Sequence, residues 1–309
     1  MNWFEKFVHS ISKTMVEPEM YGLFHIVSIA VMLAVLALLI WKFRNCSEKT
    51  FRVIMSVAWI VMVLFEVYKQ VVFSFNYDAA TGVVTWDYQW YAFPFQLCST
   101  PLYVFPFVFL APEGRFRDAF IAFVGTFSLF GGLCTMFFPA TVFMEIIGIN
   151  IQTMVHHGIQ VAIGIFALVH EREKLNIKYF LRGVLVYVGA IAVALTLNFT
   201  VRPNLNEGFN MFYINKPDSC DLPLVGDMIK PNVPYVAFLA IYILGFVAIA
   251  LLLYYIQVAI IRLVQRYVRR KGMYTYEKQR EDEKPRVYSY QKQKAKEKPR
   301  TYSYQKNKK

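Results

Sequence analysis

Residues 21–43 read YGLFHIVSIAVMLAVLALLIWKF, and this stretch decides the fold class because it is apolar over almost its whole length. The apolar run is continuous and does not alternate with polar residues, which predicts a helix rather than a strand of a barrel. At about 1.5 Å per residue, a helix of this length crosses the ~30 Å hydrocarbon core of a bilayer. The stretch therefore predicts a membrane-spanning helix.

Further apolar runs extend this prediction to an all-α, polytopic membrane protein with a seven-helix bundle. Hydrophobic residues make up 57% of the 309 residues, more than the core of a soluble protein needs. The predicted spans are residues 21–43, 51–73, 93–110, 116–138, 149–168, 179–201 and 235–264.

Basic residues are concentrated in alternate connections between these spans, which predicts the orientation of the bundle. They flank the first, third and fifth connections: Lys42, Arg44, Lys49, Arg52; Arg115, Arg117; and Arg172, Lys174, Lys178, Arg182. The second connection, residues 76–92, has no Lys or Arg and is rich in Trp and Tyr. We therefore expect the N-terminus outside, the C-terminus in the cytoplasm, and a location in the cell membrane.

The two ends of the chain differ from the membrane domain at residues 21–265. In residues 1–20, Trp3, Phe4 and Phe7 recur at helical spacing, which predicts an amphipathic helix at the membrane interface. Residues 266–309 hold 16 Lys and Arg against 5 Asp and Glu, so this tail carries nearly all of the chain's net charge of +12.

The tail also contains a Tyr-rich repeat of period 14, as YTYEKQ, YSYQKQ and YSYQKN. Low apolar content and two prolines predict that it is disordered. Its charge predicts binding to anionic lipid headgroups as its main interaction. Tyrosines between basic residues could stack on single-stranded bases, but no nucleic-acid-binding fold accompanies them, which argues against nucleic acid as a partner.

Six of the predicted spans place polar side chains at a similar depth near the outer surface. These residues are His25, Glu66, Lys69, Gln96, Cys98, Ser99, Cys134, His156, His157, Asn198 and Arg202. Polar groups inside a membrane are costly to bury, so a shared layer of them is a candidate functional site. We expect membrane lipids to be the molecules that reach it.

Within this layer, Cys98 is the candidate nucleophile and a histidine of the fifth span the candidate base. A thiol needs a neighbouring base to become a competent nucleophile, and Gln96, Ser99 and Thr100 could stabilise an oxyanion. His157 is preferred to His156 because Gly158 lets another helix approach beside it. Two alternatives remain open: Cys98 could be an inert buried side chain, or it could form a disulfide with Cys134.

The other polar residues have simpler interpretations beside the functional one. Glu66 and Lys69 are spaced to form an ion pair that neutralises itself. His25 fits a hydrogen-bonding network better than a catalytic role. The long sixth connection could be a solvated linker, or a lid whose Arg202, Asn210 and Lys216 contact a phosphate headgroup.

Three segments carry a resemblance to a known family: residues 94–99 (PFQLCS), His157-Gly158-Ile159, and residues 210–217 (NMFYINKP). They are similar to the YwaF-type family of seven-helix integral membrane proteins, over roughly residues 20–260. That family is related to a vertebrate branch of phospholipid acyltransferases with a proposed Cys and His pair. The resemblance implies Cys98 as the acyl-accepting thiol and His157, or His156, as its partner.

The leading hypothesis is therefore a membrane-embedded lipid acyltransferase or acyl hydrolase that works through a Cys98 thioester in the outer half of the bilayer, without a cofactor. A second hypothesis uses His25, Glu66, His156 and His157 as zinc ligands of a lipid hydrolase, although no short ligand spacing supports it. A third is a transporter or lipid-binding protein without enzymatic activity. The sequence assigns no oligomeric state.

Overall fold

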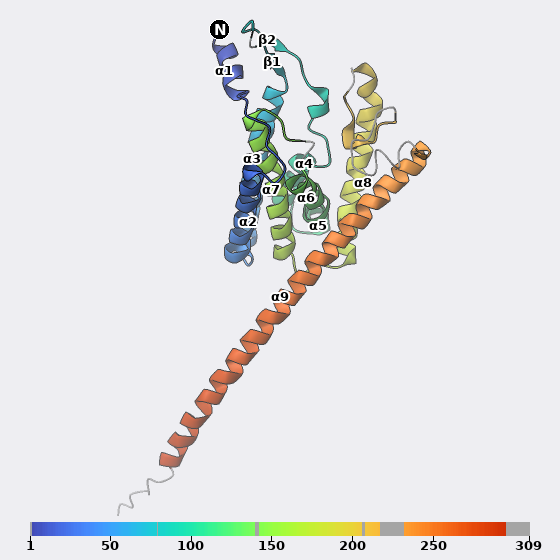
Figure 1. The fold of residues 1–309 in the computed structure, drawn as a ribbon. Coiled ribbons are helices and arrows are strands. Elements are labelled where there is room, and N and C mark those ends of the chain that lie inside the picture. The colour runs from blue at the N-terminus through green and yellow to red at the C-terminus, as the bar shows by residue number, and fades with distance from the viewer. Residues whose placement is uncertain (1, 79, 140–141, 206–207, 217–231, 295–309) are drawn as a thin grey trace, which may run out of the picture. The chain divides into compact units, whose positions relative to one another are not determined.

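The computed structural model is mostly helical, as the apolar runs predict (Figure 1). It describes residues 2–78, 80–139, 142–205, 208–216 and 232–294. The α-helices are α1 (Trp3–Ile11), α2 (Leu23–Phe43), α3 (Glu48–Val72), α4 (Pro101–Leu110), α5 (Arg115–Phe123), α6 (Leu129–Phe137), α7 (Ile147–His170), α8 (Ile177–Thr200) and α9 (Tyr235–Lys294). The shorter elements are η1 (Trp90–Ala92), the π-helical turn η2 (Val124–Ser128), η3 (Arg202–Asn204) and η4 (Met211–Tyr213).

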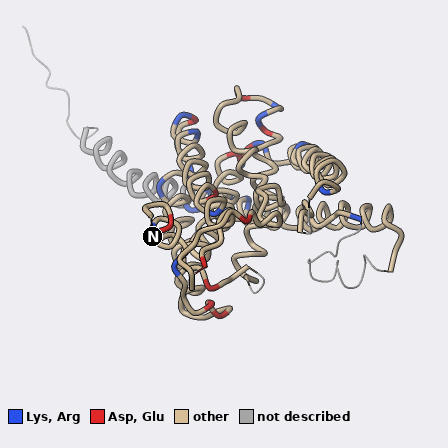
Figure 2. Tube along the Cα trace, turned by 90° about the horizontal axis from the view of Figure 1, so that it is seen from above, with Lys and Arg blue, Asp and Glu red and all other residues tan. Residues whose placement is uncertain are grey.

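Among the described residues, six helices are long and apolar enough to cross a membrane. They are α2, α3, the continuous run α5-η2-α6, α7, α8 together with η3, and the part of α9 up to Lys271. Few residues in these stretches are Asp, Glu, Lys or Arg. Most of the trace in Figure 2 is accordingly tan. The prediction of an all-α polytopic membrane protein is confirmed, whereas the orientation and the type of membrane stay predictions.

The predicted third span, residues 93–110, differs from the structure. Only Pro101–Leu110 is helical, and ten residues at about 1.5 Å each reach roughly half of the hydrocarbon thickness. Pro101 is the first residue of α4, a position where its missing N–H removes no helical hydrogen bond. Pro94 lies in the irregular segment before it, so the apolar run 93–110 is divided and seven full-length spans are not confirmed.

The ends of the chain also differ in part from the predictions. The helix α1 begins with a capping box in which the Asn2 side chain accepts from the Glu5 N–H and the Glu5 carboxylate accepts from the Asn2 N–H. The connection after α3 contains an antiparallel hairpin, β1 (Phe75–Tyr77) and β2 (Val84–Trp86), with Asn76 opposite Thr85. The interfacial position of α1 stays a prediction.

The chain divides into two units, Met1–Val258 and Ala259–Lys309. In the second unit α9 continues to Lys294, beyond residue 266 where the disordered tail was predicted to begin. Strong helix formers, mainly Arg, Lys, Glu and Gln, dominate residues 266–284 and account for the longer helix. Residues 295–309, which include the last Tyr-rich repeat, lie outside the described residues.

Helix α7 is the central helix of the first unit and packs against α2, α3 and α6. Close packing of α6 depends on Gly132, because a Cβ there would lie 2.8 Å from the Cβ of Gln160 and 2.9 Å from the carbonyl oxygen of His157. Only glycine allows this approach without displacing α7. The contact places α6 directly beside the His157 region of α7.

A cluster of charged side chains joins α5, α7 and α8 at the end of the bundle opposite α1. Asp118 of α5 pairs with Arg182 of α8 at 2.9 Å and with Lys174 at 3.4 Å. Lys174 also pairs with the buried Glu171 at 2.6 Å. Burial opposes ionisation of Glu171, but hydrogen bonds from His170 and Lys174 outweigh it and lower the pKa of this carboxyl group.

This arrangement predicts that Glu171 stabilises the fold at neutral pH and not in acid. The folded pKa lies below the unfolded value of about 4.3, so the stabilisation is present above that pH and is lost as the pH falls through the folded pKa. We expect Glu171→Gln to lower the thermal unfolding temperature at pH 7 and to match the parent protein at low pH. Unfolding curves in detergent between pH 7 and pH 3 measure this, and a difference independent of pH would contradict it.

Candidate functional site

Cys98 lies in the irregular segment of residues 93–100, directly before α4 begins. Hydrogen bonds from the Ser99 and Thr100 N–H groups to the Gln96 carbonyl, at 2.9 and 3.0 Å, form a tight turn around it. Cys98 was predicted to lie inside the spanning helix at residues 93–110, and this placement is wrong. The reason is that the helix starts only at Pro101, which leaves the backbone of the preceding residues available to other partners.

Two side chains of α7 bind the backbone of Cys98. The Nε2 of His156 donates to the Cys98 carbonyl oxygen at 2.9 Å, and the Nε2 of Gln160 donates to the same oxygen at 2.7 Å. Cys98 also lies close to α6, since a Cβ at Gly131 would lie 3.7 Å from the Cα of Cys98. Cys98 is therefore held between α6 and α7 through its main chain.

Hydrogen bonds to carbonyl oxygens determine the tautomers of both histidines, because a carbonyl only accepts. His157 donates through Nδ1 to the Thr153 carbonyl at 2.7 Å, so its Nε2 carries the free lone pair when the ring is neutral. His156 donates through Nε2 to Cys98, so its free lone pair lies on Nδ1. Both of these atoms are buried and have no hydrogen-bond partner among the described residues. Each ring thus retains one nitrogen that can accept a proton.

An ion pair of α3 completes the polar surroundings of Cys98. Glu66 Oε1 accepts from Lys69 at 2.9 Å and from Gln70 at 2.7 Å, as the predicted i,i+3 spacing requires. Both charges lie close enough to interact electrostatically with the Cys98 thiol, and the Ser99 side chain lies within its hydrogen-bonding reach. The other Glu66 oxygen, Oε2, is buried without a partner in the described part of the chain. We call Glu66, Lys69, Cys98, His156, His157 and Gln160 the Cys98 cluster.

Gln96 connects the Cys98 turn to a buried segment of the sixth connection, residues 209–215. Its side chain donates to the Asn210 carbonyl at 2.9 Å and accepts from the Phe212 N–H at 2.7 Å. Asn198 of α8 holds the same segment by bonding both the N–H and the carbonyl of Met211, at 2.8 and 3.0 Å. The three predicted residues Gln96, Asn198 and Asn210 therefore act together, as a clamp on this segment.

The clamped segment has an unusual backbone. Phe212 and Tyr213 both have φ of 58°, a left-handed conformation that costs of order 1–3 kcal/mol for a residue with a side chain. Phe212 is buried against the ring of Phe95, and the Tyr242 hydroxyl of α9 donates to its carbonyl. The surrounding contacts over-determine this strained geometry and keep the segment packed beside the Cys98 turn.

The remaining predicted site residues lie apart from the Cys98 cluster or have structural roles. His25 accepts from the Tyr21 N–H through Nδ1 and donates to the Met136 carbonyl through Nε2, so both nitrogens are used to join α2 to α6. These two bonds give His25 a structural role between α2 and α6. Arg202 lies half-buried in η3, and Lys216 is exposed just beyond the clamped segment.

The structure bears on two alternatives from the sequence: a disulfide between Cys98 and Cys134, and a zinc site. Cys98 and Cys134 are both free thiols, so the disulfide alternative is wrong. Among the described residues, the group whose ligand atoms lie within 4.8 Å of one another is Glu48, His170 and Glu171, whose carboxylates already pair with basic side chains. Among the described residues, the predicted zinc ligands His25, Glu66, His156 and His157 do not form such a group. Both nitrogens of His25 are also hydrogen-bonded to other segments.

Gln160 is a member of the cluster that was not predicted. It follows His156 by four residues, a spacing that puts both side chains on one face of α7. This spacing is visible in the sequence, and a polar pair at i and i+4 inside an apolar run could have revealed Gln160.

The fold and the site together define a polytopic helical membrane protein with a buried polar cluster built around one cysteine and two histidines. Residues 20–258 match the TMEM164 family, and the chain belongs to that family. The match covers α2 to α8 and α9 as far as Val258, with the Cys98 cluster inside it. No curated protein and no solved structure matches the chain.

Proposed function

We propose that this TMEM164-family protein transfers fatty acyl groups between membrane lipids, with the Cys98 thiol as the nucleophile. The observation that carries the proposal is the free, buried lone pair on His157 Nε2, which the hydrogen bond to Thr153 leaves unprotonated in the neutral ring. A neutral imidazole beside a thiol activates a cysteine nucleophile, and the proposal assigns this role to His157 Nε2 toward the Cys98 thiol. The motif resemblance to YwaF-type proteins and their acyltransferase relatives supports the same assignment.

In the proposed reaction His157 Nε2 takes the proton of the Cys98 thiol, and the thiolate attacks the ester carbonyl of a donor lipid. A carbon–sulfur bond forms, the ester C–O bond breaks, and the leaving alcohol receives the proton from His157. In the second step His157 takes a proton from the hydroxyl group of an acceptor lipid, which attacks the thioester. The carbon–sulfur bond breaks and the thiol regains its proton, so the enzyme returns to its starting state.

The neighbouring residues have defined roles in this proposal. His156 and Gln160 position Cys98 through its carbonyl, while Lys69 favours the negative charge of the thiolate. Ser99 provides a hydrogen-bond donor to the sulfur. If water replaces the acceptor lipid in the second step, the same site acts as an acyl hydrolase, so the acceptor alone separates the two activities.

The segment at residues 209–215 closes one side of the site in this proposal, and the lipid headgroup lies near it. Arg202 and Lys216 flank the segment and carry the positive charges that a phosphate headgroup requires. We place this end of the bundle in the outer leaflet, with the basic C-terminal tail along anionic headgroups on the cytoplasmic side. Both placements follow from the distribution of Lys and Arg.

The proposal predicts a covalent acyl adduct on Cys98 that depends on His157. Purified protein is incubated with a phospholipid carrying a deuterium-labelled acyl chain, and the Cys98 peptide is analysed by mass spectrometry. We expect the labelled chain on Cys98, and a rate of labelling roughly 10²–10⁴-fold lower in His157→Ala, the usual contribution of a general base.

His9→Ala is the matched control, because His9 is exposed on α1, distant in sequence from the cluster, and should label at the parent rate. A labelled chain that appears only on other cysteines would show that Cys98 is not the acyl acceptor. Equal labelling of the parent protein and His157→Ala would show that His157 is not the base.

A further inference from the structure

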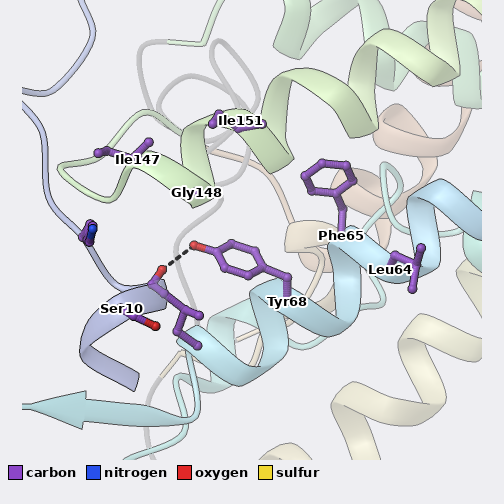
Figure 3. A pocket seen from close by; sticks show the side chains of 9 residues that line it. Ser10, Leu64, Phe65, Tyr68, Ile147, Gly148 and Ile151 are labelled. Carbon is purple, nitrogen blue, oxygen red and sulfur yellow. Dashed lines mark hydrogen bonds between the residues drawn. The ribbon is translucent and has the colours of Figure 1, made fainter. Parts of the chain in front are cut away.

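A groove lies between α1, α3 and the beginning of α7, on a part of the molecule that the proposed reaction does not use (Figure 3). It has a volume of about 450 Å³, within the range of ligand sites in proteins. Its walls are mostly apolar, and its lining residues are Ser10, Ile11, Lys13, Leu64, Phe65, Tyr68, Ile147, Gly148 and Ile151. Leu64 and Ile151 are exposed, so the groove is open along the surface of the bundle.

Several long-range contacts hold the groove in one shape. The Tyr68 hydroxyl donates to the Ile11 carbonyl at 2.7 Å, the bond drawn in Figure 3. The backbone of the segment after α1 pairs with the segment before α7, through Met15 N–H to Glu145 at 2.7 Å and Ile147 N–H to Lys13 at 3.0 Å. Gly148 is required in this wall because a Cβ there would overlap the Tyr68 hydroxyl. The groove is therefore preformed by the packing of three helices.

The rim of the groove carries positive charge next to the apolar walls. Lys13 is exposed and forms no ion pair with any residue that the structure describes. It lies beside the beginning of α7, whose N-cap residue Ile146 offers no side-chain hydrogen bond, so the positive end of the helix dipole adds to the charge of Lys13. No acidic side chain is among the lining residues.

We infer that this groove binds one anionic phospholipid, with an acyl chain along the apolar walls and the phosphate group at Lys13. The apolar walls suit an acyl chain, because alkyl groups are stabilised by removal from water. Lys13 at the rim suits the phosphate group, because an ammonium group attracts an anionic headgroup. An acyl chain bound along Leu64 and Ile151 also covers apolar surface at the edge of the bundle. The lipid is a stable ligand of the fold, and the inference does not depend on the chemistry of Cys98.

Native mass spectrometry of the detergent-purified full chain tests the inference, with phosphatidylglycerol and phosphatidylcholine of identical acyl chains as probes. We expect one phosphatidylglycerol to bind in preference to phosphatidylcholine. Lys13→Glu should weaken phosphatidylglycerol binding at least fivefold, the effect of one basic residue near an anionic lipid, and leave phosphatidylcholine binding unchanged. Leu64→Trp should fill the groove and reduce the binding of both.

Two controls match these variants. Lys6→Glu changes an exposed charge on α1 outside the groove, and Val67→Trp adds the same ring to an exposed position of α3 that does not line it. Both should bind phosphatidylglycerol as the parent protein does. Equal weakening by Lys6→Glu and Lys13→Glu would overturn the inference, as would full binding by Leu64→Trp. Competition by inorganic phosphate alone would assign the site to the free anion and overturn the role of the acyl chain.

Discussion

Cys98→Ala is expected to abolish acyl transfer between lipids, by a factor on the order of 10⁴ or more, while the protein remains folded in the membrane. Removal of the nucleophile from a catalytic set eliminates the covalent intermediate, and the remaining groups of the site cannot replace it. Transfer of a labelled acyl chain between phospholipids in vesicles that contain the purified protein measures this effect.

The structure indicates that Cys98→Ala removes the thiol without disturbing the surrounding backbone. His156 and Gln160 bind the carbonyl oxygen of residue 98, which alanine retains, so the turn before α4 keeps both hydrogen bonds. The change deletes one sulfur atom, and the loss of packing costs on the order of 1 kcal/mol. A loss of activity in folded protein therefore reports the chemistry of the thiol.

Cys134→Ala is the matched control, because Cys134 is an exposed free thiol on α6. We expect this variant to transfer acyl groups at the parent rate. Parent-like transfer by Cys98→Ala would exclude Cys98 as the nucleophile, and flux of a solute that survives in the same variant would favour the transporter hypothesis.

Arg117→Ala is expected to lower the free energy of unfolding by about 3–5 kcal/mol, the usual cost of breaking a buried ion pair. The Arg117 side chain is 1% exposed and lies 2.6 Å from Glu48 Oε1 of α3. It also donates through Nε to the Val108 carbonyl of α4 at 2.6 Å and lies over the ring of Phe51. One side chain thus connects α3, α4 and α5, and its removal leaves a void and an unpaired carbonyl.

Arg115→Ala provides the comparison, since Arg115 is exposed two residues earlier on the same helix. We expect its effect to lie within about 0.5 kcal/mol of zero. Unfolding by increasing denaturant in mixed micelles, followed by circular dichroism, measures both variants. Equal effects would show that the buried contacts of Arg117 do not stabilise the fold. In the sequence Arg117 was counted among the basic residues that flank the third connection, at the start of the predicted span 116–138, and its buried contacts were not predicted.

The sequence predicted the long helices well and the Cys98 region poorly. Residues 21–43 were predicted as a span, and α2 extends over Leu23–Phe43. Such agreement follows because a run of twenty apolar residues has one stable structure in a bilayer, whatever its neighbours are. Residues 93–110 were also predicted as a span, yet Pro94, Pro101 and a tight turn divide them, and hydropathy alone does not register backbone geometry.

In the Cys98 cluster, too, contacts within one helix were predicted from the sequence and contacts between segments were not. Glu66 and Lys69 pair as their i,i+3 spacing predicted, because that contact is local to one helix. The tautomers of His156 and His157, the commitment of His25 to Met136 and the role of Gln160 were not available from the sequence. Each depends on a carbonyl oxygen whose position is determined by the packing of other segments.

Patterns in the sequence were enough to identify a helical, multi-pass membrane protein and the polar residues that its apolar helices carry. Hydropathy, helical period and ion-pair spacing are properties of short stretches of chain, so they can be read without a fold. Which of those polar atoms contact one another depends on how the helices pack in three dimensions. The bonds from His156 and Gln160 to Cys98 join residues 58 and 62 positions apart, and they form only because α6, α7 and the turn before α4 pack closely at Gly131 and Gly132.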